Sequence, residues 1–354
     1  MIYFDNAATT RVCDAAKKQL ARDWWNPSSL HGLGLAAEDE ISAARQAVAQ
    51  ALGATPREIF FTSGGTEGNN IAILGGMSSA RGNHIITTAV EHASILEPIK
   101  KLACDGTCVT YLAPSDITED GVLAALRSDT ALISIMSVNN ETGAIFPLFP
   151  IARAVRAAGY KGLIHTDAVQ AFMKIPISLR DGLVDLVTVS GHKIHAPKGV
   201  GALYIRRGTR IAPRTFGGSQ EGAMRPGTQN VPGIAALRAA IESYLGVPSL
   251  MGELKSALAD IPCVQLICKG DAPHIVAAAI PGFPSEVIMR MLEERGIYIS
   301  AGSACSRGKK SHVIAAYNLP PRLSDSAVRI SISNETTRDE ISEFAAAIRE
   351  LFMK

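Results

Sequence analysis

The chain has 354 residues, of which 47% are hydrophobic and 19% charged, a balance typical of globular enzymes. Its formal net charge is only +2, and Lys and Arg are scattered among acidic residues, so we expect a small-molecule substrate and no nucleic-acid partner. No run approaches the ~20 apolar residues that cross a bilayer, so we expect no membrane association. The length predicts one large and one smaller domain.

The N-terminus has neither a basic segment nor a long apolar stretch, so we expect no signal peptide and a cytoplasmic location. The six cysteines are few and irregularly spaced, which favours free thiols over disulfides or a zinc site, and no metal is expected. We interpret five of them as small buried hydrophobic side chains, namely Cys13, Cys104, Cys108, Cys263 and Cys268.

Short apolar runs alternate with helical patterns such as 151–158 in the first two thirds of the chain. The runs predicted to be strands are 58–62, 84–88, 131–136, 163–166, 186–189 and 202–205. Near-continuous apolar strands separated by helices are typical of a mainly parallel sheet covered on both faces. The pattern therefore predicts an α/β domain.

The pattern changes around residues 247–249. Strands are predicted at 275–280, 297–299 and 328–333, with a helix over 285–295 and a last helix that begins at a capping box, Thr337 to Glu340. We therefore expect a large domain over 12–246 and a small α+β domain formed by 1–11 and 247–354.

A glycine-rich turn follows the first predicted strand of the large domain. It reads Ser63-Gly64-Gly65-Thr66-Glu67-Gly68-Asn69 and leads into a helix. The backbone N–H groups of such a turn, with the helix dipole, suit a phosphate. A tight connection between strand and helix is an equally simple interpretation.

Polar residues also follow two later strands, where open α/β sheets place their ligands. His92 could stack on a planar cofactor or be a structural residue. Asn140, in the loop 138–143, could hold a phenolic oxygen or a substrate carboxylate, although turn formation is the commoner role of Asn.

Asp167 and Lys193 end successive predicted strands, which places a carboxylate and an amine at the same edge of the sheet. A buried acid requires a positively charged partner such as a pyridinium nitrogen, although Asp167 could equally be a helix N-cap. An amine at a strand end can form an imine with an aldehyde, whereas most lysines are simply solvated.

These segments together resemble the cysteine desulfurases of the class V aminotransferase family, in the branch with a Ser-x-Cys active loop. The resemblance runs nearly end to end. The segments that carry it are Tyr3–Thr10, Asn26–His31, Phe61–Glu67, Glu91-His92, Val138–Gly143, Asp167-x-x-Gln170, Ser190–Lys193, Pro197–Tyr204, Arg225–Thr228, Gly302–Cys305 and Val328–Ser331. The resemblance implies the fold type I of pyridoxal-phosphate-dependent transferases, with a seven-stranded, mainly parallel sheet.

The resemblance also implies the site residues. Lys193 binds pyridoxal 5'-phosphate covalently and later moves the substrate's α-proton, while Cys305, carried by the small domain, accepts the sulfur. His92 stacks on the cofactor ring as a further catalytic residue. The other cofactor contacts implied are Asp167 at the ring nitrogen, Gln170 and Asn140 at the hydroxyl side, and Gly65, Thr66, Ser190 and His192 at the phosphate, with Thr228 reaching the phosphate of a neighbouring subunit.

The implied reaction converts L-cysteine into L-alanine and leaves a persulfide on Cys305 for a sulfur-acceptor protein, in iron–sulfur cluster assembly or a thiolation pathway. Arg329, together with Asn140, binds the substrate carboxylate, a task suited to the arginine fork. The reach of Thr228 implies a homodimer. Two departures from the family are Gly65, where Ala is frequent, and the basic segment 306–310 after Cys305.

Three alternatives stay open at this stage. A class V aminotransferase would use the same cofactor residues but would not need Cys305. A selenocysteine lyase would also share them. A catalytically inactive sulfur carrier on the same fold would be expected to lack Lys193 or Asp167, and both are present.

Overall fold

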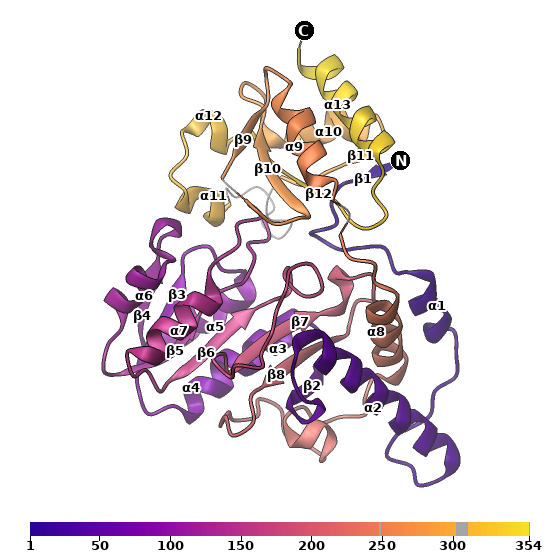
Figure 1. The fold of residues 1–354 in the computed structure, drawn as a ribbon, viewed down its shortest axis with the longest axis vertical. Helices are drawn as coiled ribbons and strands as arrows, with labels where there is room; N and C mark the ends of the chain where they lie inside the picture. The colour runs from indigo at the N-terminus through magenta and orange to yellow at the C-terminus, as the bar shows by residue number, and fades with distance from the viewer. Residues whose placement is uncertain (248, 269, 302–310, 354) are drawn as a thin grey trace. The chain divides into compact units, whose positions relative to one another are not determined.

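The computed structural model of the protein describes residues 1–247, 249–268, 270–301 and 311–353. The chain divides into two compact units (Figure 1). The larger unit comprises Arg11–Ser137 and Phe146–Tyr244, and the smaller unit comprises Met1–Thr10, Val138–Ile145 and Leu245–Lys354. Among the described residues, no helix combines the length and apolar character needed to span a membrane.

A seven-stranded sheet in the order β2-β8-β7-β6-β5-β3-β4 forms the centre of the larger unit. β8 runs antiparallel to both of its neighbours, and the other pairings are parallel. The prediction of a mainly parallel seven-stranded sheet is confirmed. The strands are β2 (Ile59–Thr62), β3 (His84–Thr88), β4 (Cys108–Leu112), β5 (Thr130–Ser134), β6 (Leu163–Asp167), β7 (Leu186–Ser190) and β8 (Gly201–Ile205).

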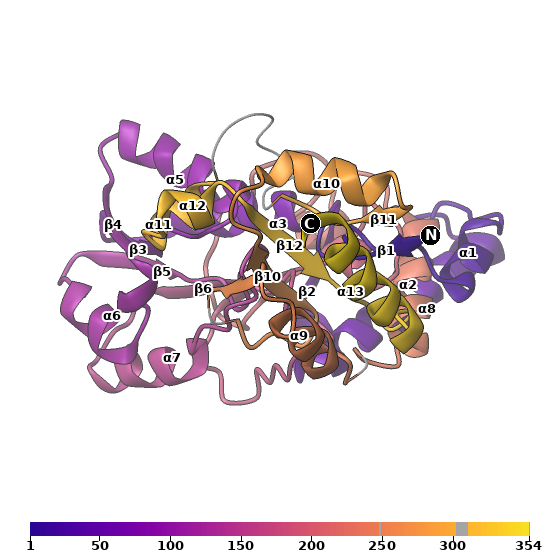
Figure 2. The ribbon, with the colours of Figure 1, turned by 90° about the horizontal axis from the view of Figure 1, so that it is seen from above.

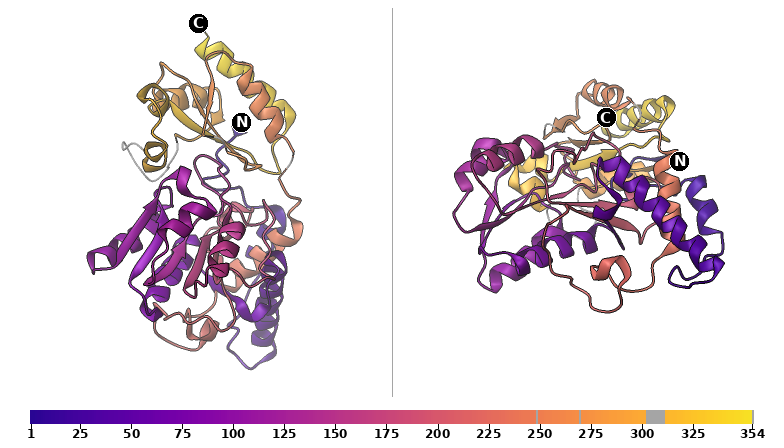
Figure 3. Two further views of the ribbon diagram at one scale, coloured as in Figure 1. Left: turned by 60° about the vertical axis from the view of Figure 1, so that its left-hand side comes forward. Right: turned by 60° about the horizontal axis from the view of Figure 1, so that its bottom comes forward.

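Helices lie on both sides of this sheet (Figure 3), which explains why the inner strands β3, β5, β7 and β8 are buried along their whole length. α8 packs against both α1 and α2. The helices are α1 (Asp14–Leu20), α2 (Gly32–Leu52), α3 (Gly65–Asn70), α4 (Gly76–Ser79), α5 (Ala93–Cys104), α6 (Glu119–Ala125), α7 (Leu148–Ala157) and α8 (Val231–Ser243), with a π-helical turn at Ile71–Gly75 and a 3-10 turn at Gly191–Lys193.

The cysteine interpretation is wrong for two residues. Cys104 and Cys108 are exposed, because one ends α5 and the other begins β4, the strand at the edge of the sheet. Cys13, Cys263 and Cys268 are half-buried.

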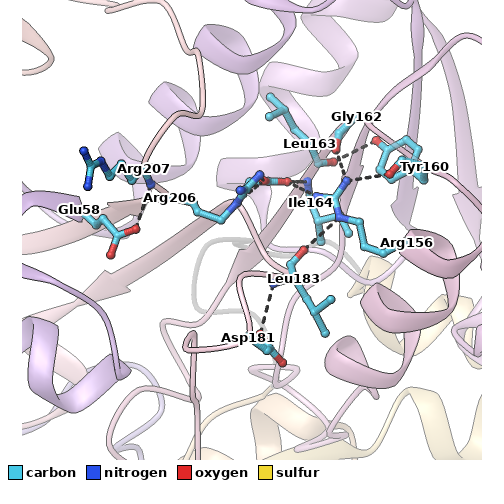
Figure 4. Close-up of polar contacts among 11 residues, drawn as sticks. Glu58, Arg156, Tyr160, Gly162, Leu163, Ile164, Asp181, Leu183, Arg206 and Arg207 are labelled. Carbon is cyan, nitrogen blue, oxygen red and sulfur yellow. Dashed lines mark hydrogen bonds and ion pairs between the residues drawn. The ribbon is translucent and has the colours of Figure 1, made fainter.

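A buried acid, Asp185, ties together the segments around β6, and Figure 4 labels its partners Arg156, Ile164 and Arg206. Its carboxylate is 1% exposed and accepts hydrogen bonds from Arg156, Arg206 and the backbone N–H of Ile164. Arg156 also donates to the backbone carbonyls of Tyr160, Gly162 and Leu183. Both guanidinium groups therefore depend on one carboxylate to balance their charge.

Asp185→Asn should lower the free energy of unfolding by about 3–5 kcal/mol, since removing one partner of a buried ion pair leaves buried charge without compensation. Urea unfolding at neutral pH measures this change. Asp14→Asn is the matched control, because Asp14 pairs with Lys17 at the surface and should contribute little. Equal stability of the two variants would contradict a central role for Asp185.

The smaller unit contains an antiparallel sheet in the order β12-β10-β9 and a parallel pair of β1 and β11. α9 and α13 pack against each other beside the sheet (Figure 2), and Phe4 meets Phe344 edge to face in the core. The strands are β1 (Ile2–Tyr3), β9 (Gln265–Ile267), β10 (Ile275–Ala279), β11 (Ile297–Tyr298) and β12 (Ala327–Ser331), and the helices are α9 (Met251–Ala259), α10 (Ser285–Glu293), α11 (His312–Ala316), α12 (Pro321–Ser324) and α13 (Arg338–Phe352).

The segment 138–145 lies inside the predicted large domain, 12–246, but the structure groups it with the smaller unit. Val138 bridges Ile145, and the carbonyl of Gly143 accepts the N–H of Ala272. Gly143 has a φ of +72°, and a Cβ there would stand 2.5 Å from the carbonyl oxygen of Ile275. This close backbone approach anchors the loop 138–143, which contains Asn140, to the smaller unit.

Candidate active site

The turn Gly64-Gly65 lies against two strand ends of the larger unit. Gly64 has a φ of +145°, a conformation that favours glycine. A Cβ on Gly65 would stand 2.8 Å from Val169 Cγ2 and 3.9 Å from Ser190 Cβ. Gly65, Ser190 and the segment after Asp167 therefore meet at one edge of the sheet, as their positions at strand ends predict. Thr66, the next residue of the turn, is exposed.

Asp167 ends β6 and is almost fully buried, with 6% of its surface exposed. Its Oδ1 accepts the N–H of Val169 at 2.9 Å, and its Oδ2 accepts Nδ2 of Asn69 at 2.7 Å. Both hydrogen-bond partners are neutral amide groups. A buried carboxylate held in this way can still pair with a positively charged ligand atom.

His92 is joined to Asp167 through two polar side chains. Asn69, which is fully buried, donates from Nδ2 to both Asp167 and Ser94 Oγ, the latter at 2.8 Å. Ser94 Oγ lies 2.8 Å from Nδ1 of His92, and that nitrogen also accepts the backbone N–H of Ser94 at the start of α5. The imidazole is therefore held in one orientation by the same network that holds the carboxylate.

Glu91 is a buried acid beside Asp167 and His92 whose role cannot be read from the sequence. It is completely buried, and its Oε1 accepts hydrogen bonds from the backbone N–H of Met136 at 2.8 Å and from Thr88 Oγ1 at 3.0 Å. Burial raises the pKa of Glu91 to about 8, and the nearby charge of Asp167 adds to the rise, while these two hydrogen bonds oppose it. Below pH 8 Glu91 is therefore mainly neutral.

Glu91→Gln should change how stability depends on pH. Because the folded pKa of about 8 lies above the usual 4.5, the stabilising effect of the protonated acid is full below pH 4.5 and is lost as pH rises toward 8. Relative to the variant, the unfolding free energy of the parent protein should fall by about 1 kcal/mol per pH unit across this window. Denaturant unfolding at several pH values measures the slope, and parallel curves would contradict a neutral Glu91.

Lys193 lies in a basic environment at the end of the 3-10 turn after β7. Burial lowers the pKa of Lys174 well below its usual value, and the charge of Lys193 lowers it further. Burial and the charges of Lys193, Lys198 and Lys174 lower the pKa of His192 to about 3. Lys174 Nζ donates to Oε1 of Gln170 at 3.4 Å. A partly buried group of basic side chains at this edge suits an anionic ligand.

Thr228 is exposed in the loop before α8. The loop is anchored by Glu221, which has a φ of +48° and a nearly buried carboxylate. That carboxylate accepts two hydrogen bonds from Arg45, at 2.7 and 2.8 Å, and one from the backbone N–H of Phe61. The bidentate pair holds Glu221 in an unfavourable backbone conformation.

Arg329 and Asn140 meet in the smaller unit. Nη1 of Arg329 donates to the backbone carbonyl of Asn140 at 2.9 Å, and Nη2 donates to Oδ1 of Asp5 at 2.7 Å. Arg329 is 3% exposed, and its Nε has no hydrogen-bond partner among the described residues. The guanidinium therefore keeps a buried donor for a ligand.

Cys305 and the basic segment 306–310 lie outside the described residues. The first described residue after them is Ser311, whose hydroxyl donates to Oε2 of Glu141 and caps α11 by accepting the N–H of Ile314.

The sequence and fold define a known class of protein. Residues 2–344 match the family described as Aminotransferase class-V, so the chain belongs to this family of pyridoxal-phosphate-dependent enzymes.

Curated and solved relatives agree with this assignment. The chain is 39% identical to a cysteine desulfurase of Trichormus azollae, over 99% of this chain and 92% of the relative. A solved NifS-like protein has a TM-score of 0.92 and 35% identity, covering 99% of each chain. A structure described as SspA in complex with cysteine has a TM-score of 0.85 and 31% identity, covering 95% of this chain and 100% of that one.

The residues of the larger unit fit the family's cofactor. The glycine turn leads into the start of α3, where backbone N–H groups can bind a phosphate. Asp167 supplies a buried carboxylate for a ring nitrogen, and Lys193 supplies the amine for an aldehyde.

Proposed function

We propose that the protein is a cysteine desulfurase, which converts L-cysteine into L-alanine and transfers the sulfur to Cys305 as a persulfide. The near full-length likeness to proteins named cysteine desulfurase, at 39% identity, carries the proposal. The solved relative in complex with cysteine supports the choice of substrate. The meeting of Asp167, His92 and the glycine turn at one sheet edge supports the cofactor site.

In this proposal the larger unit supplies most of the residues that would hold the cofactor, and Asn140 comes from the smaller unit. When bound, pyridoxal phosphate supplies an electron sink that weakens bonds to the substrate's carbon atoms. Lys193 attaches to it, Asp167 keeps its ring nitrogen protonated, and His92 covers its ring. The remaining contacts are Gln170 and Asn140 at the ring hydroxyl, Gly65, Thr66, Ser190 and His192 at the phosphate, and Thr228 of the partner subunit.

The substrate is held and cleaved by residues with separate tasks. Arg329, with Asn140 beside it, binds the α-carboxylate, and the amine of Lys193 takes the proton from the α-carbon. The thiolate of Cys305 then attacks the substrate sulfur. An S–S bond forms as the C–S bond of cysteine breaks, its electrons return to the carbon with a proton, and alanine leaves.

Product analysis tests the proposal. Purified protein supplied with pyridoxal phosphate, L-cysteine and a thiol reductant should release alanine and sulfide in equal amounts. Amino transfer from L-cysteine to a keto acid, which leaves 3-mercaptopyruvate and releases neither alanine nor sulfide, would favour an aminotransferase. Faster turnover of selenocysteine, with cysteine left unchanged, would favour a selenocysteine lyase.

The proposal extends to assembly and partners. The exposed position of Thr228 on an anchored loop supports a homodimer that shares its sites, and sedimentation should give twice the mass of the 37.4 kDa chain. The persulfide would pass to an acceptor protein, with iron–sulfur cluster assembly as one destination. Because Cys305 has to be a free thiol before it accepts sulfur, and the cytosol keeps thiols reduced, we place the enzyme in the cytoplasm.

A further inference from the structure

Residues 4–7 of the N-terminal segment are hydrogen-bonded to Ser331 of β12. The carbonyl of Phe4 accepts the N–H of Ser331 at 2.7 Å, and Nδ2 of Asn6 donates to the carbonyl of Ser331 at 3.1 Å. The N–H of Ala7 donates to Ser331 Oγ at 2.8 Å. These bonds fix the backbone on both sides of Asp5. Their partner Ser331 lies two residues along β12 from Arg329.

Asp5 is thereby placed against the guanidinium of Arg329. Its Oδ1 lies 2.7 Å from Nη2, and its side chain is 22% exposed, while that of Arg329 is 3% exposed. The pair is therefore poorly screened by water. Asp5 balances the charge of the arginine but leaves Nε available as a donor, because Nε has no partner among the residues that the structure describes.

A second acid belongs to the same surroundings. Burial raises the pKa of Glu141, the hydrogen bond from Ser311 lowers it, and the charges of Arg329 and His312 lower it further. Burial raises the pKa of Tyr3. The charge of Asp5 raises it further, and the charge of Arg329 lowers it. Among the described residues, Asp5 is the carboxylate paired directly with Arg329, so it offsets the positive charge of the guanidinium before a ligand binds.

We propose that Asp5 determines substrate specificity by balancing the charge of Arg329, so that the site accepts an amino acid with one carboxylate and disfavours one with a second acidic group. The inference rests on the proposed function, in which Arg329 binds the α-carboxylate. The α-carboxylate uses the free donors of the guanidinium. A second anionic group on the same ligand is repelled by the charge of Asp5.

Asp5→Asn tests the inference, because it keeps the side-chain shape and an acceptor oxygen but removes the charge. The measured quantities are the dissociation constants of L-alanine and L-aspartate, obtained from the change in cofactor absorbance of the holoenzyme at one ionic strength. Because both ligands have an α-carboxylate, a change in how tightly Arg329 binds that group cancels in the ratio of the two constants. The preference for alanine should fall roughly tenfold in the variant, as expected for removing one like charge at close range.

Three further variants sharpen this test. Asp260→Asn makes the same chemical change at an exposed position of the smaller unit and should leave the ratio unchanged. Asp5→Glu restores the charge and should recover much of the preference. Asp5→Ser also removes the charge and replaces the Asn variant if that variant does not fold, as judged by thermal unfolding.

The outcomes separate the inference from the proposed function. An unchanged ratio in a folded Asp5→Asn holoenzyme that binds both ligands would overturn the role of Asp5 and leave the desulfurase proposal intact. If neither amino acid alters the cofactor absorbance of the parent holoenzyme, while the cofactor itself is bound, the proposed function is contradicted and the inference with it.

Discussion

Lys193→Ala should abolish turnover of L-cysteine, with a loss of about 10⁴-fold or more, because one side chain both binds the cofactor and moves the α-proton. The lysine lies at the end of β7, in a turn whose basic neighbours are partly buried, and alanine offers neither an amine nor a base. The absorbance of the lysine-bound cofactor should disappear as well. Steady-state assays and absorbance spectra of the same preparation measure both effects.

Lys198→Ala is the matched control for this variant. Lys198 lies in the segment after the same turn and is exposed, so its removal should leave covalent cofactor binding in place. Retention of the lysine-bound spectrum and of normal turnover by Lys193→Ala would remove Lys193 from its proposed role. Loss of folding is excluded when the variant keeps the thermal unfolding temperature of the parent protein.

The central strands were predictable because burial on both faces leaves a near-continuous apolar run. The runs at 84–88 and 186–189 match β3 and β7 to within one residue. The capping box at Thr337 and Glu340 likewise begins α13, since its reciprocal hydrogen bonds depend on a local pattern alone.

Two edge strands, β4 and β9, were missed for the opposite reason. β4 exposes part of its surface and mixes Cys, Thr and Tyr with apolar residues, and β9 exposes two of its three residues. The antiparallel direction of β8 and the membership of 138–145 in the smaller unit depend on contacts between distant parts of the chain. Periodicity along the sequence contains no information on either feature.

The candidate site was predictable where chemistry follows a strand end, as for Asp167 and Lys193. The residues that orient the site's side chains could not be predicted from the sequence. Asn69 stands within the glycine-rich motif, but its links to Asp167 and Ser94 depend on the packing of α3 against α5. Asp5 stands in a motif that carried the family resemblance, yet its pairing with Arg329 joins opposite ends of the chain.

Cys305→Ser should bind the cofactor normally and still bind L-cysteine through Arg329, because neither task is assigned to the thiol. Sulfur transfer should nevertheless fall by about 10³-fold or more, since a serine hydroxyl is far less ionised and less nucleophilic than a thiol at neutral pH. Alanine release measures turnover. Mass spectrometry of the parent enzyme after brief exposure to L-cysteine should show one added sulfur on the peptide that contains Cys305.

Cys104→Ser supplies the control for this loss, because Cys104 is an exposed free thiol at the end of α5 with no role in the proposed reaction. It should keep both alanine release and the added sulfur on Cys305. Full activity of Cys305→Ser on cysteine would contradict the persulfide route and favour an aminotransferase or a lyase. Activity lost on cysteine but kept on selenocysteine would identify the lyase, because a selenium leaving group can depart from the substrate without attack by an enzyme thiol.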